Sequence, residues 1–256
     1  MRQSIGHWVI LWAFAPALTF AQGAMPDLPN RALEAGTQLI LHTGIHVPSG
    51  ALAQRFGAAN TVGMGVRRTT TSGWRVGVQY RFQTGSEVRE PGLLQNLRDP
   101  NGHIIDNEGR IALVAVQQRG TLFLGTIGRK WPLGMGHAET GIIAEIGGGY
   151  WEHKIHFQNR GNRVTQLDDP HVEGYDRLSG GIVAMPRLGV EYHSKNGQVR
   201  FHAGIEGMLG RIQPSRLWNA DTEDVDDGPR TDSAWGFFAG WILRLKARTT
   251  SVDYYH

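Results

Sequence analysis

The chain has 256 residues, of which 35 are Gly and none is Cys. Gly costs a helix interior roughly 0.5–1 kcal/mol per position, so this scattered Gly argues against a mainly helical protein, while eight Trp and nine Phe argue against disorder. The lack of Cys excludes disulfide frameworks, thiolate metal sites and iron–sulfur clusters. A net charge of +3 is too small to indicate a nucleic-acid partner.

The first residues, Met1–Gln22, have the pattern of a secretory signal peptide. Arg2 precedes an apolar run, Trp8–Phe20, and the small residue Ala21 follows it. The run is shorter than the roughly 20 residues that a transmembrane helix needs. We therefore expect cleavage after Ala21 and export of the mature protein, with a buried N-terminal helix as the alternative.

Apolar and polar residues alternate with a period of two along most of the remaining chain, which is typical of strands with one apolar face. In Trp74–Phe82, for example, Trp74, Val76 and Val78 oppose Arg75 and Gly77. In Thr121–Trp131 the pattern is blurred, and the facing of that strand stays open. The eight expected strands are Thr37–Val47, Asn60–Thr69, Trp74–Phe82, Thr121–Trp131, Ala138–Tyr150, Ile182–His193, Val199–Arg211 and Ala234–Lys246.

Strand length and loop length together favour a membrane barrel. Most of these strands exceed the usual 5–6 residues of a globular strand and match the roughly 9–11 residues of a tilted membrane-spanning strand. Short connections alternate with long ones, as in outer-membrane barrels with periplasmic turns and external loops. The short ones are 70–73, 132–137 and 195–197, and the long ones are 48–59, 84–120, 159–179 and 213–233.

The predicted fold is therefore all-β, an eight-stranded antiparallel up-and-down transmembrane β-barrel with short periplasmic turns and long external loops. Its expected parts are a signal peptide at 1–21, a periplasmic N-terminal segment at 22–35, the barrel at 36–248 and a C-terminal tail at 249–256 with Tyr254 and Tyr255. Both ends of the mature chain are expected in the periplasm.

With the apolar faces toward lipid, charged side chains of both signs face the lumen. An unpaired charge out of water is costly, so we expect a paired polar network that fills the lumen. A narrow or proton-gated pore and a lumenal catalytic site are the alternatives. The candidate lumenal residues are Arg67, Arg75, Arg81, Glu139, Glu145, Arg187, Glu191, Arg200, His202, Glu206 and Arg244.

Other motifs carry weaker signals, and none of them predicts a catalytic residue, a metal site or a cofactor. His153 and His156 fall on opposite faces of a strand, which is poor geometry for one metal ion. The acidic run Asp221–Gly228 departs from the calcium-loop spacing and is expected to be a solvated external loop. The apolar middle of the longest loop, Pro91–Gly109, is expected to cover the barrel mouth or to meet a partner protein.

Four stretches resemble a group of exported barrels from Bacteroidota: Ser49–Gly57, Asn101–Gly109, Gly147–Ile155 and Gly174–Gly181. Relatives of that group include accessory barrels of the type IX secretion and gliding apparatus, so the resemblance implies an accessory role and no catalytic residues. Within the last stretch, Gly174, Tyr175, Asp176 and Arg177 form a candidate loop contact motif. The alternative is that Asp176 and Arg177 pair locally in a loop-to-strand turn.

The sequence thus predicts a non-enzymatic outer-membrane protein that serves as a structural or accessory subunit of an envelope or secretion complex. Its expected partners are outer-membrane lipid and other envelope proteins. The competing hypotheses are a small channel and, after it, a lipid-modifying barrel enzyme.

Overall fold

A computed structural model describes residues 33, 35–133, 140–159, 161, 164–194, 199–225 and 228–245. The expected signal peptide and the C-terminal tail lie outside these residues. Eight antiparallel strands form one closed barrel, in which each strand pairs with its neighbours in the chain and β1 closes the ring against β8. The predicted eight-stranded up-and-down barrel is confirmed. The strands are β1 Gly36–Gly50, β2 Ala59–Thr69, β3 Trp74–Gly85, β4 Val114–Pro132, β5 Gly141–Asn159, β6 Ser179–His193, β7 Arg200–Pro214 and β8 Arg230–Leu245.

The observed strands overlap the predicted ones and their ends agree within four residues, apart from two larger differences. β4 begins seven residues before the predicted Thr121, and β5 continues nine residues past the predicted Tyr150. The β4 extension carries polar residues on both faces, such as Gln117 and Gln118, so no alternation marks it. In the β5 extension the apolar residues, such as Trp151 and Ile155, face inward, whereas Tyr150 before them faces outward, so the alternation changes face there. The facing of β4 is now resolved, because Leu122 and Leu124 are buried inside while Phe123 is exposed outside.

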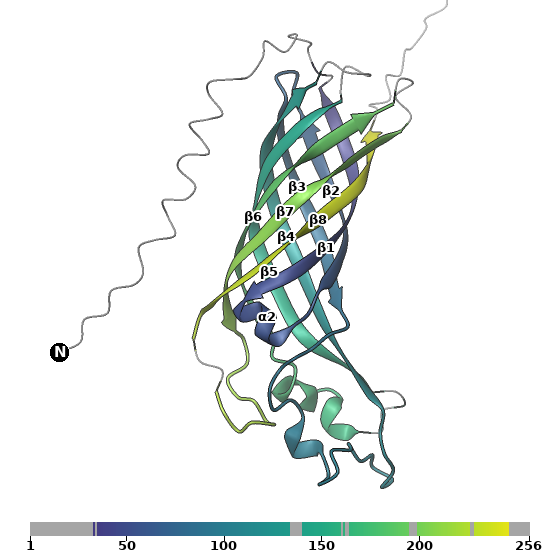
Figure 1. Cartoon of the computed structure of the whole chain (residues 1–256), viewed down its shortest axis with the longest axis vertical. Coiled ribbons are helices and arrows are strands. Elements are labelled where there is room, and N and C mark those ends of the chain that lie inside the picture. The colour runs from purple at the N-terminus through teal and green to yellow at the C-terminus, as the bar shows by residue number, and fades with distance from the viewer. Residues whose placement is uncertain are drawn as a thin grey trace, which may run out of the picture.

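Loop lengths sort the two ends of the barrel as the sequence predicted. The strand ends that the short connections join lie at one end of the barrel, here called the turn end, and those that the long connections join lie at the other, the loop end (Figure 1). The long connections, 51–58, 86–113, 160–178 and 215–229, together form what we call the head. They hold the short helix α2, Ala51–Arg55, and three 3-10 helices: η1 Gln95–Leu97, η2 Thr165–Leu167 and η3 His171–Gly174.

The barrel interior changes character along its length. The half nearer the turn end is filled with charged side chains, including Arg67, Arg75 and Glu191. The half nearer the loop end is mainly apolar, with a few buried polar groups such as His153 and Asp232, and its apolar side chains, such as Leu124 and Trp151, belong to one hydrophobic cluster that continues into the head. The barrel and its head therefore share a single core.

Inward glycines make room for the long charged and aromatic side chains. A Cβ added at Gly240 of β8 would lie 2.5 Å from Nε2 of His202 on β7, and one at Gly63 of β2 would lie 2.9 Å from Cγ of Arg81 on β3. Real Cβ atoms do not approach other atoms this closely, so a larger residue would displace these side chains. The high Gly content is thus partly a packing requirement of a narrow, filled barrel.

Candidate functional site: the lumenal network and the head

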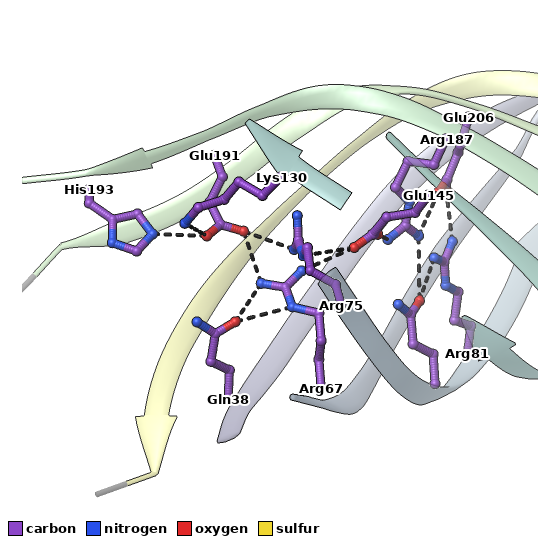
Figure 2. A network of polar contacts seen from close by, with 11 residues as sticks. Gln38, Arg67, Arg75, Arg81, Lys130, Glu145, Arg187, Glu191, His193 and Glu206 are labelled. Carbon is purple, nitrogen blue, oxygen red and sulfur yellow. Dashed lines mark hydrogen bonds and ion pairs between the residues drawn. The ribbon is translucent and has the colours of Figure 1, made fainter. Parts of the chain in front are cut away.

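Seven of the predicted lumenal residues, Glu191 among them, lie together in one buried network (Figure 2). The carboxylate of Glu191 accepts from Arg67 and Arg75 at 2.9 Å each, and from Lys130 at 2.8 Å. Nε2 of His193 lies 2.9 Å from the same carboxylate. Every oxygen of Glu191 thus faces a donor, which is the condition under which a buried charge is tolerated.

Two further carboxylates extend this network toward the barrel middle. Glu206 accepts from Arg81 at 2.8 Å and from Nη2 of Arg187 at 2.8 Å. Glu145 lies 3.0 Å from Arg75 and 3.2 Å from Arg187, so it joins the two groups. We call the whole set the lumenal network: Gln38, Arg67, Arg75, Gln79, Arg81, Lys130, Glu145, Arg187, Glu191, His193 and Glu206.

The network draws a side chain from every strand except β8, which supplies Phe238 instead. The guanidinium of Arg187 lies 4.5 Å from the centre of the Phe238 ring. Strands far apart in the sheet are therefore tied across the lumen, and the ties are charge-assisted hydrogen bonds. Because these side chains are buried, they fill the cross-section of the lumen where they lie.

The remaining predicted lumenal residues do not all join this network. His202 is buried, and its ring packs against His42 and Phe238. Arg200 and Arg244 lie at the turn end, where Arg244 donates to the carbonyl of Ala35. Glu139 lies outside the described residues.

Sequence reasoning missed Lys130, whose ammonium is a donor to Glu191. Lys130 belongs to the strand with the blurred pattern, in which both faces carry apolar residues. Lys130 stands two residues before Pro132, the last residue of β4. Inward and outward positions alternate along a strand, and counting back from the turn end places Lys130 inward.

The head closes the loop end of the barrel. Leu94 and Ile104, from the apolar segment Pro91–Gly109, are buried in the same hydrophobic cluster as Leu52 and Phe56. The backbone amide of Leu94 donates to Asp221 at 2.9 Å, which ties two long connections together. The segment packs over the barrel mouth, which is the first of its two predicted arrangements.

The candidate contact motif lies inside the head rather than on its surface. Tyr175, Asp176 and Arg177 are all buried. Asp176 accepts from Arg216 at 3.0 Å, and Arg177 donates to Asp221 at 2.5 Å. The alternative expectation of a local Asp176–Arg177 pair is wrong, because each residue pairs with the β7–β8 connection instead. The hydrogen bond from Arg216 to Asp176 raises the pKa of the Arg216 guanidinium above its ordinary value.

Two other expectations concern Asp221 of the head and His153 of β5. The expected solvated loop at Asp221–Gly228 begins inside the head, since Asp221 is buried and holds Leu94 and Arg177; the solvated description is wrong for this residue. His153 faces inward, where Nε2 lies 2.9 Å from Asp232 between Phe56 and Trp151. His156 falls on the opposite face of β5, as its spacing predicted.

No group of three or more His, Asp or Glu side chains is arranged to bind a metal ion within the part of the chain that the structure describes. In the same residues no helix is long and apolar enough to cross a membrane.

Comparisons with known proteins returned matches to solved structures alone. No protein-family model matches the sequence, and no curated protein matches it. Neisserial surface protein A (NspA) has a TM-score of 0.45 at 10% identity, covering 83% of this chain and 100% of that one. The outer membrane protein OprG from Pseudomonas aeruginosa has a TM-score of 0.40 at 13% identity, covering 85% and 99%.

A third solved structure is Ail, the attachment invasion locus protein of Yersinia pestis, determined in complex with the heparin analogue sucrose octasulfate. Its TM-score is 0.39 at 10% identity, covering 82% of this chain and 100% of that one. All three TM-scores are below 0.5. The evidence for the fold of this chain is therefore its own strand pairing, which forms a closed ring of eight strands.

Proposed function

We propose that the protein is an integral outer-membrane β-barrel. The observation that carries this proposal is an inverted distribution of polarity: large apolar side chains cover the outside while charges fill the inside. Val62 and Met64 of β2 are 54% and 58% exposed, whereas Arg81 of the adjacent β3 is 0% exposed. Apolar outward faces recur on all eight strands, and this band is what a barrel in lipid presents.

The closed ring is the second support for a membrane location. In lipid every backbone polar group needs a partner within the protein, so only helices and closed barrels span a bilayer. Here the β1–β8 ladder runs from Thr37–Leu245 to Gly50–Asp232, leaving no open edge at the seam. With the short turns in the periplasm, the head stands outside the cell.

Membrane insertion is tested by migration on a gel before and after boiling. A folded barrel runs faster unboiled than boiled, and it stays in the membrane fraction after carbonate washing. Recovery as a soluble periplasmic protein with no heat-dependent shift would contradict the proposal.

Within the membrane we propose a structural or accessory role rather than transport or catalysis. The lumenal network and the apolar half above it fill the interior in series, and the head covers the mouth. The His153–Asp232 pair is the kind of pair that could serve acid–base chemistry, but both side chains are 0% exposed and so cannot meet a substrate. Planar-bilayer recording of the purified protein should show no single-channel steps, and reproducible steps would favour the channel hypothesis instead.

The head is the part suited to meeting another envelope protein. It is tied internally by buried pairs such as Arg177–Asp221, and it carries exposed apolar residues, with Leu113 and Leu217 each 87% exposed. The further assignment to a Bacteroidota secretion or gliding complex is supported by the four sequence stretches that resemble that group. Crosslinking in the native membrane from position 217, compared with position 78 in the lipid-facing wall, tests this role; equal yields of a discrete adduct at both positions would contradict it.

A further inference from the structure

An exposed arginine is held between two tryptophans at the turn end of the barrel wall. Arg129 faces outward on β4, and its guanidinium carbon lies 5.9 Å from the ring centre of Trp74 and 5.9 Å from that of Trp131. Both separations are within the roughly 6 Å range of cation–π attraction. The two indoles thus hold an exposed cation in one place on the outer wall.

A second exposed arginine stands on the other side of Trp74. Arg68 of β2 pairs with Val76 of β3, two residues beyond Trp74, and Trp74 itself pairs with Arg129 of β4. Two inter-strand spacings and an offset of two residues along the strands separate Arg68 from Arg129, about 12 Å between their backbones, which the two long side chains can span. Arg68 and Arg129 can therefore reach a common group above Trp74.

Among the outward strand positions that the structure describes at the turn end, the charged side chains are Arg68 and Arg129, in the sector that they form with Trp74 and Trp131. At the turn end, the outward positions of the other described strands carry uncharged side chains: Thr37, Ile142, Tyr192, Phe201 and Leu245. Neither Arg68 nor Arg129 forms an ion pair with a carboxylate anywhere in the described chain. Two like charges with no counter-charge among the described residues repel each other, so the sector favours an anion from outside the protein.

The position of the sector relative to the apolar band indicates which kind of anion it meets. Val66, Val76 and Ile127 lie just inside it on the same three strands and are exposed, so the sector marks the edge of the apolar band. Tryptophan favours the level of lipid headgroups in a membrane. A guanidinium is suited to phosphate, because its fork of N–H donors matches two phosphate oxygens.

We propose that Arg68 and Arg129, with Trp74 and Trp131, form a binding site for the phosphate of an anionic glycerophospholipid in the periplasmic leaflet. This inference rests on the proposed membrane location and adds a ligand class and a specific sector of the wall to it. The acyl chains would lie along Val66, Val76 and Ile127, while the indoles hold the guanidinium of Arg129 at the headgroup level.

The site is tested by refolding the whole protein into phosphatidylcholine vesicles that contain about 20% phosphatidylglycerol. At this fraction basic residues can still enrich the anionic lipid around the protein. The lipids retained on the extracted protein are then counted by native mass spectrometry. The variants are Arg68→Gln, Arg129→Gln and the double variant. Arg211→Gln is the matched control, because Arg211 is an exposed, outward arginine at the loop end of β7.

We expect the ratio of retained phosphatidylglycerol to phosphatidylcholine to fall about fivefold for each arginine removed from the sector, and to stay unchanged in Arg211→Gln. Equal ratios in all four variants and the parent protein would overturn the site. A parallel arm adds inorganic phosphate: if it displaces the lipid at millimolar concentration, the site binds free phosphate and the lipid assignment is wrong.

A failure of the site is distinguishable from a failure of the proposed membrane location. Each refolded sample is first checked for heat-dependent gel migration and for vesicle association. If the parent protein does not insert, the membrane location itself is wrong and the site falls with it. If it inserts and shows no lipid preference, the site alone is overturned.

Discussion

Glu206 is the residue whose removal should disturb the lumen most clearly. Its carboxylate accepts hydrogen bonds from Arg81 and Arg187, and Nε2 of His46 lies 2.9 Å from the same carboxylate. Glu206→Gln leaves the buried Arg81 without its carboxylate partner and Arg187 with Glu145 alone, so we expect unfolding free energy to fall by about 3–5 kcal/mol. Urea unfolding in detergent micelles, followed by loss of the fast-migrating gel form, measures this change.

Arg211→Gln is the control for Glu206→Gln, because it removes a charge from the same strand at an exposed, outward position. We expect its unfolding free energy to stay within about 0.5 kcal/mol of the parent. If Glu206→Gln unfolds at the same urea concentration as Arg211→Gln, the lumenal network contributes no stability.

Two adjacent glycines of β5 separate packing from backbone effects. A Cβ at Gly149, which faces inward, would overlap the carbonyl oxygen of Phe123 and lie 3.0 Å from Cα of Leu124, whereas a Cβ at Gly148, which faces outward, meets no atom within 4 Å. We expect Gly149→Ala to destabilise the barrel by about 1–3 kcal/mol and Gly148→Ala to be neutral or mildly stabilising. The same urea titration compares them, and equal effects would mean that the inward glycines are not needed for packing.

Among the elements, the segment that covers the mouth can be tested with two leucines. Leu94 is 0% exposed in the shared core, and Leu113, from the same connection, is 87% exposed. Leu94→Ala removes buried apolar area and leaves a cavity, with an expected cost of about 2–5 kcal/mol concentrated in the head. We therefore expect faster proteolysis of the external loops on intact vesicles, with unchanged heat-dependent migration of the barrel.

Leu113→Ala serves as its control and should leave the proteolysis rate unchanged. Equal rates for Leu94→Ala and the parent protein would show that the segment does not hold the head together.

How far the sequence predicted each element depended on its surroundings. β3 was predicted closely, because one face meets the outside and the other meets charged lumenal groups, which produces strict alternation. β4 was not, because Leu122 and Leu124 face an apolar interior near the loop end, so both faces of the strand are apolar there. Periodicity reports a difference between two environments, and it disappears where the environments are alike.

The candidate site shows the same limit. Alternation correctly placed Arg67, Arg75 and Glu191 inside, since facing is a local property of a strand. Which carboxylate each arginine reaches depends on the stagger of strands across the ring, and the partners are far apart in sequence: Arg67 and Glu191 are 124 residues apart. The pairing of Asp176 with Arg216, rather than with its neighbour Arg177, likewise follows from how the long connections pack.

At the scale of the whole molecule, the barrel and its head form one filled body with charged groups inside and an apolar exterior. The lumenal network contains three carboxylates, Glu145, Glu191 and Glu206, against four arginines and Lys130. This arrangement places charged groups of opposite sign against one another inside the barrel and leaves the outward faces apolar. These outward faces therefore need lipid around them.

The surrounding medium can be measured directly, because the 256-residue chain contains no Cys. Single cysteines at Val76 and Val78 of β3 and at Leu113 of the head, all exposed positions, would carry spin labels in native outer membranes. We predict that labels at 76 and 78 collide mainly with oxygen, which concentrates in lipid, and that the label at 113 collides mainly with a water-soluble nickel complex. Strong nickel access at all three positions would contradict a membrane-spanning barrel.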